Sequence, residues 1–170
     1  MVFHTEMKII CTYVFLGIAI VVGQTTILKL TFLQNGVYDL LIPMVVFARL
    51  NLSVKTAGVI ALVMGYVMDL FSGGQFGLYI TSYLWILIGV KVISGYFSIQ
   101  GSISWAILIA LCVLFENVIF FLFSGGPVQE VLMEGHKLRS VILQTSLAAI
   151  SGPAIVMGLE RIYQRIEGVE

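Results

Sequence analysis

Charged side chains are scarce in this 170-residue chain, at 11% of all residues, whereas a soluble domain carries about 25%. So few charges cannot cover a water-soluble globule of this size, and we therefore expect lipid to be the solvent. The nine basic residues are balanced by nine acidic ones, so the chain lacks the net positive charge that favours nucleic acid. The composition argues against a soluble domain and against a nucleic-acid-binding protein.

Residue types that form catalytic and metal sites are also few. Cys11 and Cys112, the two cysteines, lie inside apolar runs without the spacing of metal ligands, and we interpret both as membrane-buried thiols. His4 and His136 are single histidines in polar segments. The sequence has no Gly-rich phosphate loop, no nucleophile–base pair and no metal-ligand cluster. We therefore predict a protein that is not an enzyme and uses no cofactor or metal.

Long apolar runs make up most of the chain, which is 59% hydrophobic. A helix of about 20 apolar residues crosses the hydrocarbon core of a bilayer. We predict an all-α integral membrane protein in which residues 1–170 form a single domain of six transmembrane helices. These predicted spans are residues 9–28, 39–50, 54–71, 76–96, 103–123 and 138–162.

The second predicted span is too short for the bilayer. As a helix it is about 17 Å long, against a hydrocarbon core of about 30 Å. Asp39 is the predicted N-cap, and Pro43 falls in the first turn, where its missing N–H is tolerated. Because non-helical backbone at membrane depth must be shielded by protein, we expect this segment to be packed among the other helices.

Basic residues predict the orientation. If the N-terminus is cytoplasmic, the inner side carries more basic residues than the outer side, as the positive-inside rule requires. Both termini then lie in the cytoplasm, whereas Asp39 and Asp69 lie towards the outer side. The inner residues are Lys8, Arg49, Lys55, Lys91, Arg161 and Arg165, and the outer ones are Lys29, Lys137 and Arg139.

Residues 58–77 combine a stripe of small side chains with an acid and a glycine-rich turn. On a helix, Gly58, Gly65 and Asp69 fall within about 40° of one another, with Ala61 beside them. In a membrane, small residues let two helix backbones approach closely. We interpret this set as a helix-packing or partner interface, consisting of Gly58, Ala61, Gly65, Asp69, Gly74 and Gly77.

Asp69 lies at the C-terminal end of its predicted helix, where the helix dipole disfavours an anion. We expect its carboxylate to accept hydrogen bonds from backbone N–H groups of the turn at residues 73–77. Two alternatives stay open. Asp69 could pair with an outer cation such as Lys29 or Arg139 at a partner-facing surface, or it could bind a substrate or an ion.

Glu116 lies inside the fifth predicted span, at a depth where an acid costs about 2.5–3.5 kcal/mol on insertion scales. It should therefore face protein and find polar partners. We predict a buried polar cluster of Glu116, Asn117 and Gln144, with Gln24 and Thr145 as further candidate partners. The alternative is a proton or substrate relay, although no second titratable group except Asp69 lies at a matching depth.

The sixth predicted span carries small residues at two helical spacings. Ala148 and Gly152 form one pair, and Ala154 and Gly158 form the other. We interpret both pairs as internal helix packing rather than a partner interface. Pro153 is expected to bend this helix.

The pattern Gly58…Gly65…Asp69-Leu70…Gly77, the short second span, the acid in the fifth span and the six-span size resemble the rod shape-determining protein MreD family. The resemblance implies a non-catalytic protein of the bacterial cytoplasmic (inner) membrane that binds the membrane-anchored protein MreC. It further implies a scaffold of the peptidoglycan elongation machinery that helps to determine cell shape, together with MreB, RodA and a class B penicillin-binding protein.

The same layout is also similar to the substrate-binding S components of energy-coupling-factor vitamin transporters, and the MreD fold is expected to be similar to theirs. That alternative predicts a small-residue patch on the first helix, where this chain offers only Ala19 and Gly23. It also predicts an outer pocket of polar and aromatic side chains, for which the candidates are Tyr38, Gln75, Tyr79 and His136. We favour the MreD interpretation.

Overall fold

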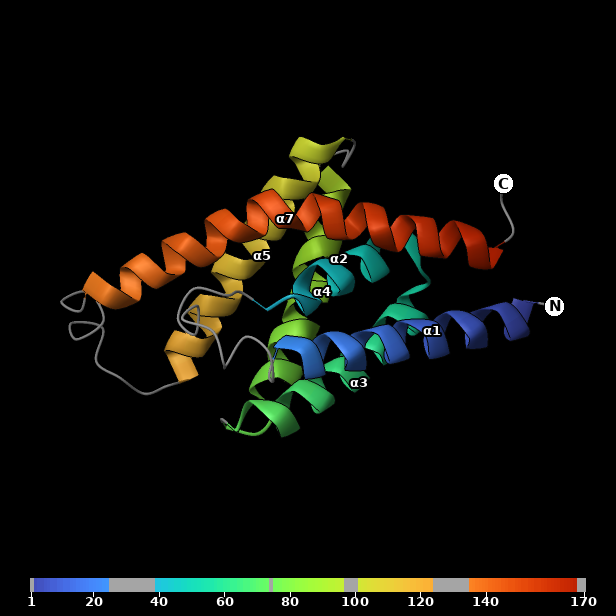
Figure 1. Ribbon diagram of the computed structural model, residues 1–170, viewed down its shortest axis with the longest axis horizontal. Helices are drawn as coiled ribbons and strands as arrows, with labels where there is room; N and C mark the ends of the chain where they lie inside the picture. Colours follow the sequence, from blue (N-terminus) through green and yellow to red (C-terminus); the bar gives the residue numbers. More distant parts are fainter. Residues whose placement is uncertain (1, 25–38, 74, 97–100, 124–134, 168–170) are drawn as a thin grey trace.

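The computed structural model describes residues 2–24, 39–73, 75–96, 101–123 and 135–167 (Figure 1). These residues contain helices and turns and no strand, which confirms the all-α prediction. The first turn of α1 and the last turn of α7 lie at the same end of the molecule. The helices are α1 (Val2–Val22), α2 (Leu41–Asn51), α3 (Val54–Ser72), α4 (Leu78–Tyr96), α5 (Ser102–Phe123) and α7 (Gly135–Glu167).

Four helical segments within the described ranges are long and apolar enough to cross a membrane, and they mark a multi-pass membrane protein. Three of them begin and end within two residues of the predicted boundaries, and the last extends four residues beyond its predicted end. They are Val54–Ser72, Leu78–Tyr96, Ser102–Phe123 and Leu138–Ile166.

The first two predicted spans correspond to shorter apolar helices. Met7–Val22 takes the place of residues 9–28, of which 25–28 lie outside the described residues. Leu41–Asn51 takes the place of residues 39–50. At 1.5 Å per residue, the 21 residues of α1 as a whole are long enough for a core of about 30 Å, whereas the 11 residues of α2 are not.

The short helix α2 lies at the centre of the protein and contacts all five other described helices. Residues 41–48 are all buried, which confirms that this segment is packed among the other helices. Phe47 of α2 stacks against Tyr13 of α1, with 6.1 Å between ring centroids, and meets Tyr163 of α7 edge-on at 6.1 Å. Trp105 of α5 lies 6.5 Å from the same ring. The core is therefore built around α2.

Side-chain caps begin α3 and α2. Ser53 is the N-cap of α3, and its hydroxyl accepts from the Thr56 N–H at 3.2 Å. Leu40, the residue just before α2, has helical dihedral angles and makes no side-chain capping bond. Asp39 does the capping, as predicted, because its carboxylate accepts from the Leu41 N–H at 3.0 Å. It therefore satisfies one of the orphan donors of the helix terminus.

Packing between the long helices is uneven. α3 packs extensively with α4, and α5 with α7, whereas α4 and α5 contact each other less. On α7, Ala148 is buried, and a Cβ on Gly152 would lie 2.7 Å from Ile109 Cδ1, so this small pair packs against α5. Ala154 and Gly158 are exposed, so internal packing was the wrong interpretation for that pair.

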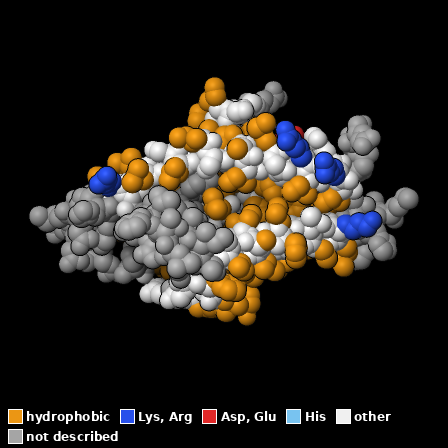
Figure 2. Space-filling view, in the orientation of Figure 1, with side chains coloured by type: hydrophobic (Ala, Val, Ile, Leu, Met, Phe, Trp, Pro, Cys, Tyr) orange, Lys and Arg blue, Asp and Glu red, His pale blue; other side chains and the backbone are white. Residues whose placement is uncertain are grey.

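Large apolar side chains cover much of the surface, as expected for a protein in contact with lipid. Phe15, Ile103 and Ile150 are each 77% exposed, and they come from three different helices. In Figure 2 hydrophobic side chains spread across the middle of the visible face, and Lys and Arg side chains lie towards its two ends. This distribution matches an apolar belt between two polar margins.

Candidate functional site

Asp39, immediately before α2, is the centre of an interior polar network. Its carboxylate accepts hydrogen bonds from the Tyr83 hydroxyl, from Gln24 Nε2 at 3.1 Å and from the Leu41 N–H at 3.0 Å. The Gln24 side-chain oxygen in turn accepts from the Leu40 N–H at 3.2 Å. The network therefore ties the end of the α1 segment and the side of α4 to the N-terminus of α2. That end of a helix stabilises a negative charge.

A second carboxyl group interacts electrostatically with Asp39. Glu116 of α5 is only 5% exposed, and its Oε1 has no hydrogen-bond partner among the described residues. Glu116 interacts electrostatically with Asp39, Tyr79 and Tyr83. We name these residues, together with Gln24, the Asp39–Glu116 cluster.

The predicted cluster of Glu116, Asn117 and Gln144 does not form. Asn117 Nδ2 donates to the Val113 carbonyl of its own helix at 2.8 Å. Within the described ranges, no hydrogen bond joins Glu116 to Asn117 or to Gln144. Consecutive helical residues point about 100° apart, so a side chain adjacent in sequence to Glu116 faces a different neighbour.

Tyr83 was not among the site residues predicted from the sequence. Its hydroxyl lies in the middle of an apolar span, one helical turn after Tyr79, and the two rings meet edge-on at 6.2 Å. A phenol buried at membrane depth needs a hydrogen-bond partner, which is the signal that could have identified it. Gln24 was a candidate partner of Glu116, but it binds Asp39 instead.

Asp69 joins the end of α3 to the start of α4. Its carboxylate accepts from the Tyr79 N–H at 3.0 Å and from the Ile80 N–H at 3.3 Å. The bonds are to backbone N–H groups, as the first interpretation predicted, but the donors belong to the first turn of α4 rather than to residues 73–77. An acid at this position satisfies orphan donors and complements the helix dipole. Lys29, an alternative partner, lies outside the described residues.

The stripe of small residues divides into different roles. A Cβ on Gly65 would lie 2.7 Å from Ile80 Cα, so α3 and α4 approach closely there, whereas a Cβ on Gly58 would meet nothing within 4 Å. Ala61 is fully buried. Gly77 has φ +97°, a conformation that favours glycine, just before α4 begins. Gly74 lies outside the described residues.

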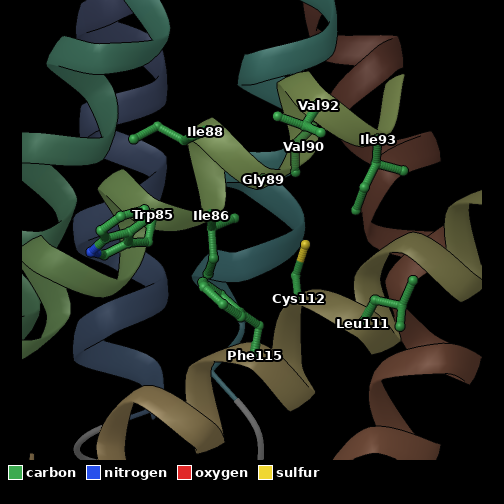
Figure 3. Close-up of a pocket in the computed structure, with 10 residues that line it drawn as sticks. All are labelled: Trp85, Ile86, Ile88, Gly89, Val90, Val92, Ile93, Leu111, Cys112 and Phe115. Carbon is green, nitrogen blue, oxygen red and sulfur yellow. The ribbon is translucent and has the colours of Figure 1, made fainter. Parts of the chain in front are cut away.

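A separate apolar cavity of about 430 Å³ lies between α4 and α5, where these helices diverge (Figure 3). Gly89 and Trp85 of α4 and Cys112 and Phe115 of α5 are among its lining residues. Trp85 is 52% exposed and Phe115 is 42% exposed, so the cavity opens towards the lipid-facing surface. It is therefore suited to an apolar occupant.

The described residues show no group of three or more His, Cys, Asp and Glu side chains that could hold a metal ion. Asp39 and Asp69 are instead hydrogen-bonded at helix termini, whereas Glu116 Oε1 and Ser82 Oγ are buried without a hydrogen-bond partner among the described residues. Comparison of the chain with protein-family models, with curated proteins and with solved structures found no match.

Proposed function

We propose that this protein is a non-catalytic membrane scaffold of the bacterial cell-wall elongation machinery that binds an MreC-like protein and helps to determine rod cell shape. MreB, RodA and a class B penicillin-binding protein are the further components of that machinery. The main structural support is that two of the acids bind helix termini. Asp39 and Asp69 accept hydrogen bonds from the N-terminal turns of α2 and α4, so both serve to hold helices together.

The proposal includes six membrane crossings with both termini in the cytoplasm of a bacterial inner membrane, and a fold similar to that of the transporter S components. In that arrangement, residues before and after the short helix α2 complete the second crossing. The start of α1 and the end of α7 lie at the same end of the molecule (Figure 1). This placement supports six crossings, because an even number of crossings returns the chain to its starting side.

The transporter alternative predicts a polar and aromatic outer pocket, and two observations favour the scaffold instead. The cavity between α4 and α5 has an apolar lining. Tyr79, a candidate pocket residue, packs edge-on against Phe120 with 4.9 Å between ring centroids, so its ring is part of the helix packing. Gln75 is exposed.

An MreC-like partner has a single membrane span, and most of its contact with this protein would be made within the bilayer. Association there depends on close packing and on a few hydrogen bonds rather than on hydrophobic burial. The exposed apolar side chains of this protein are spread over all its long helices. The large apolar surface therefore leaves ample room for a helical partner.

Affinity purification of the tagged protein in mild detergent, followed by identification of co-purifying proteins, tests the proposal. We expect recovery of an MreC-like single-span protein with a periplasmic domain. An unrelated six-span membrane protein with the same tag is the control. Recovery of two ATPases and a coupling subunit would establish the transporter alternative, and recovery of neither set would refute the scaffold.

A further inference from the structure

We infer that the Asp39–Glu116 cluster binds one small monovalent cation, with Glu116 as the residue that receives it. The ligand carries a single positive charge and is small enough for a closed polar site. Two sources can supply it, a proton or an alkali-metal ion. The inference concerns the isolated protein and does not depend on its partner.

The Asp39–Glu116 cluster contains two acids and no basic side chain. Asp39 and Glu116 are two carboxyl groups that interact electrostatically inside a membrane domain. The other described groups that interact with Glu116 are Tyr79, Tyr83 and Cys112, none of which is a base. On the neighbouring α3, Asp69 adds a further acid that interacts with Tyr79. Two buried like charges without a cation are strongly unfavourable, so one compensating positive charge is required.

Glu116, rather than Asp39, provides the carboxylate oxygen that can receive the cation. The Asp39 carboxylate already accepts three hydrogen bonds, from Tyr83, Gln24 and Leu41. Glu116 is 95% buried, and its Oε1 has no partner among the described residues. A buried carboxylate oxygen that lacks a donor pays the full desolvation penalty, and a bound cation removes this penalty. Glu116 is therefore the site of binding, and Asp39 is the charge that strengthens it.

The surroundings of Glu116 leave room only for a small ligand. The large apolar cavity lies elsewhere, between Trp85 and Phe115, and none of its lining residues belongs to the cluster. Glu116 is buried and Asp39 is half-buried, which favours a bare ion or a proton over an organic ammonium group. Since the described residues lack a set of three His, Cys, Asp or Glu ligands, a multivalent transition metal is a poor fit.

Occupancy of the site should stabilise the contact of α5 with α2 and α4. α5 packs less extensively with α2 and α4 than with α7, so a cation bound at Glu116 would strengthen a sparse contact. The bound protein should therefore unfold at a higher temperature than the empty protein.

The test measures the thermal unfolding midpoint of the purified full-length protein in detergent. Sodium chloride is exchanged for choline chloride at constant ionic strength, and each salt is used at a mildly acidic and a mildly alkaline pH. Wild type is compared with Glu116→Gln, which removes the charge but keeps the shape of the side chain. Glu160→Gln, an exposed acid on α7, is the matched control.

An alkali-metal site predicts that sodium raises the midpoint of wild type and of Glu160→Gln by several degrees, but not that of Glu116→Gln. A proton site predicts no sodium effect and a higher midpoint at acidic pH, because the folded protein then binds more protons than the unfolded chain. That pH effect is expected to be absent in Glu116→Gln. Asp39→Asn should weaken either response, which provides a second variant if Glu116→Gln does not fold.

Two results overturn the inference. One is a wild-type midpoint that responds neither to sodium nor to acidification. The other is a response that Glu116→Gln retains in full, because the cation would then act somewhere other than the Asp39–Glu116 cluster.

Discussion

Gly65→Ala is the substitution whose effect the structure defines most closely. The new Cβ would lie 2.7 Å from Ile80 Cα and 2.9 Å from the Ile80 nitrogen, which are backbone atoms that no rotamer change can move. Carbon atoms pack at 3.5 Å or more, so α4 must move away from α3 by about 0.8 Å. The Asp69–Ile80 hydrogen bond is already 3.3 Å long, and we expect this movement to break it.

The free energy of unfolding should fall substantially. Overpacking costs about 1–3 kcal/mol, and a lost hydrogen bond to a charged group costs about 1.5–3 kcal/mol. Alanine recovers about 1 kcal/mol through its higher helix propensity, which leaves a net destabilisation of about 1.5–5 kcal/mol. For a chain of this size, the thermal midpoint should fall by about 3–20 °C.

Gly58→Ala is the matched control, because a Cβ on Gly58 meets nothing within 4 Å on the same helix. We expect its thermal unfolding midpoint in detergent to equal that of wild type or to exceed it slightly. Asp69→Asn combined with Gly65→Ala should destabilise less than the sum of the two single changes, since both weaken the same hydrogen bond to Ile80. Equal midpoints for Gly65→Ala and Gly58→Ala would refute the close approach of α3 and α4.

Three further predictions follow from the packing, the polar network and the proposed topology. Gly152→Ala should destabilise by about 1 kcal/mol in the same unfolding assay, because the nearest atom is the movable Cδ1 of Ile109, although Ile109 Cγ2 also lies 3.0 Å away. Gly158→Ala should leave the midpoint unchanged or slightly higher. An effect of Gly152→Ala as large as that of Gly65→Ala would contradict this reasoning. Tyr83→Phe should lower the stability by about 1–3 kcal/mol, because Asp39 loses a buried donor, and an unchanged midpoint would place that hydroxyl outside the network. A reporter fused to the C-terminus should be active only in the cytoplasm, and periplasmic activity would refute the proposed topology.

Features that depend on local sequence could be predicted well. The all-α class follows from apolar runs of helical length, and three predicted spans match their helices within two residues. Ser53 caps α3 because its hydroxyl reaches an N–H group only three residues away. The burial of α2 was also predictable, because its length of 11 residues and its apolar composition require shielding by other helices.

Features that depend on which helix lies opposite could not be predicted. The sequence placed Gly58 and Gly65 on one stripe with equal weight, and only the position of Ile80 makes Gly65 a contact and leaves Gly58 open. It grouped Glu116 with Asn117 and Gln144 by their similar depth in the membrane, whereas in the fold Glu116 interacts electrostatically with Asp39, which precedes α2.

Composition and periodicity are properties of each segment alone. They were enough to predict that the chain is helical, that its helices suit a membrane, and that its few polar groups must be shielded from lipid by protein. The tertiary structure decided that α2 is the centre of the protein, contacted by every other described helix. It also decided that Asp39, Tyr83 and Gln24 meet there. Those hydrogen bonds join residues up to 44 positions apart in sequence, and the direction in which one helix faces another is set by the packing of all the helices together.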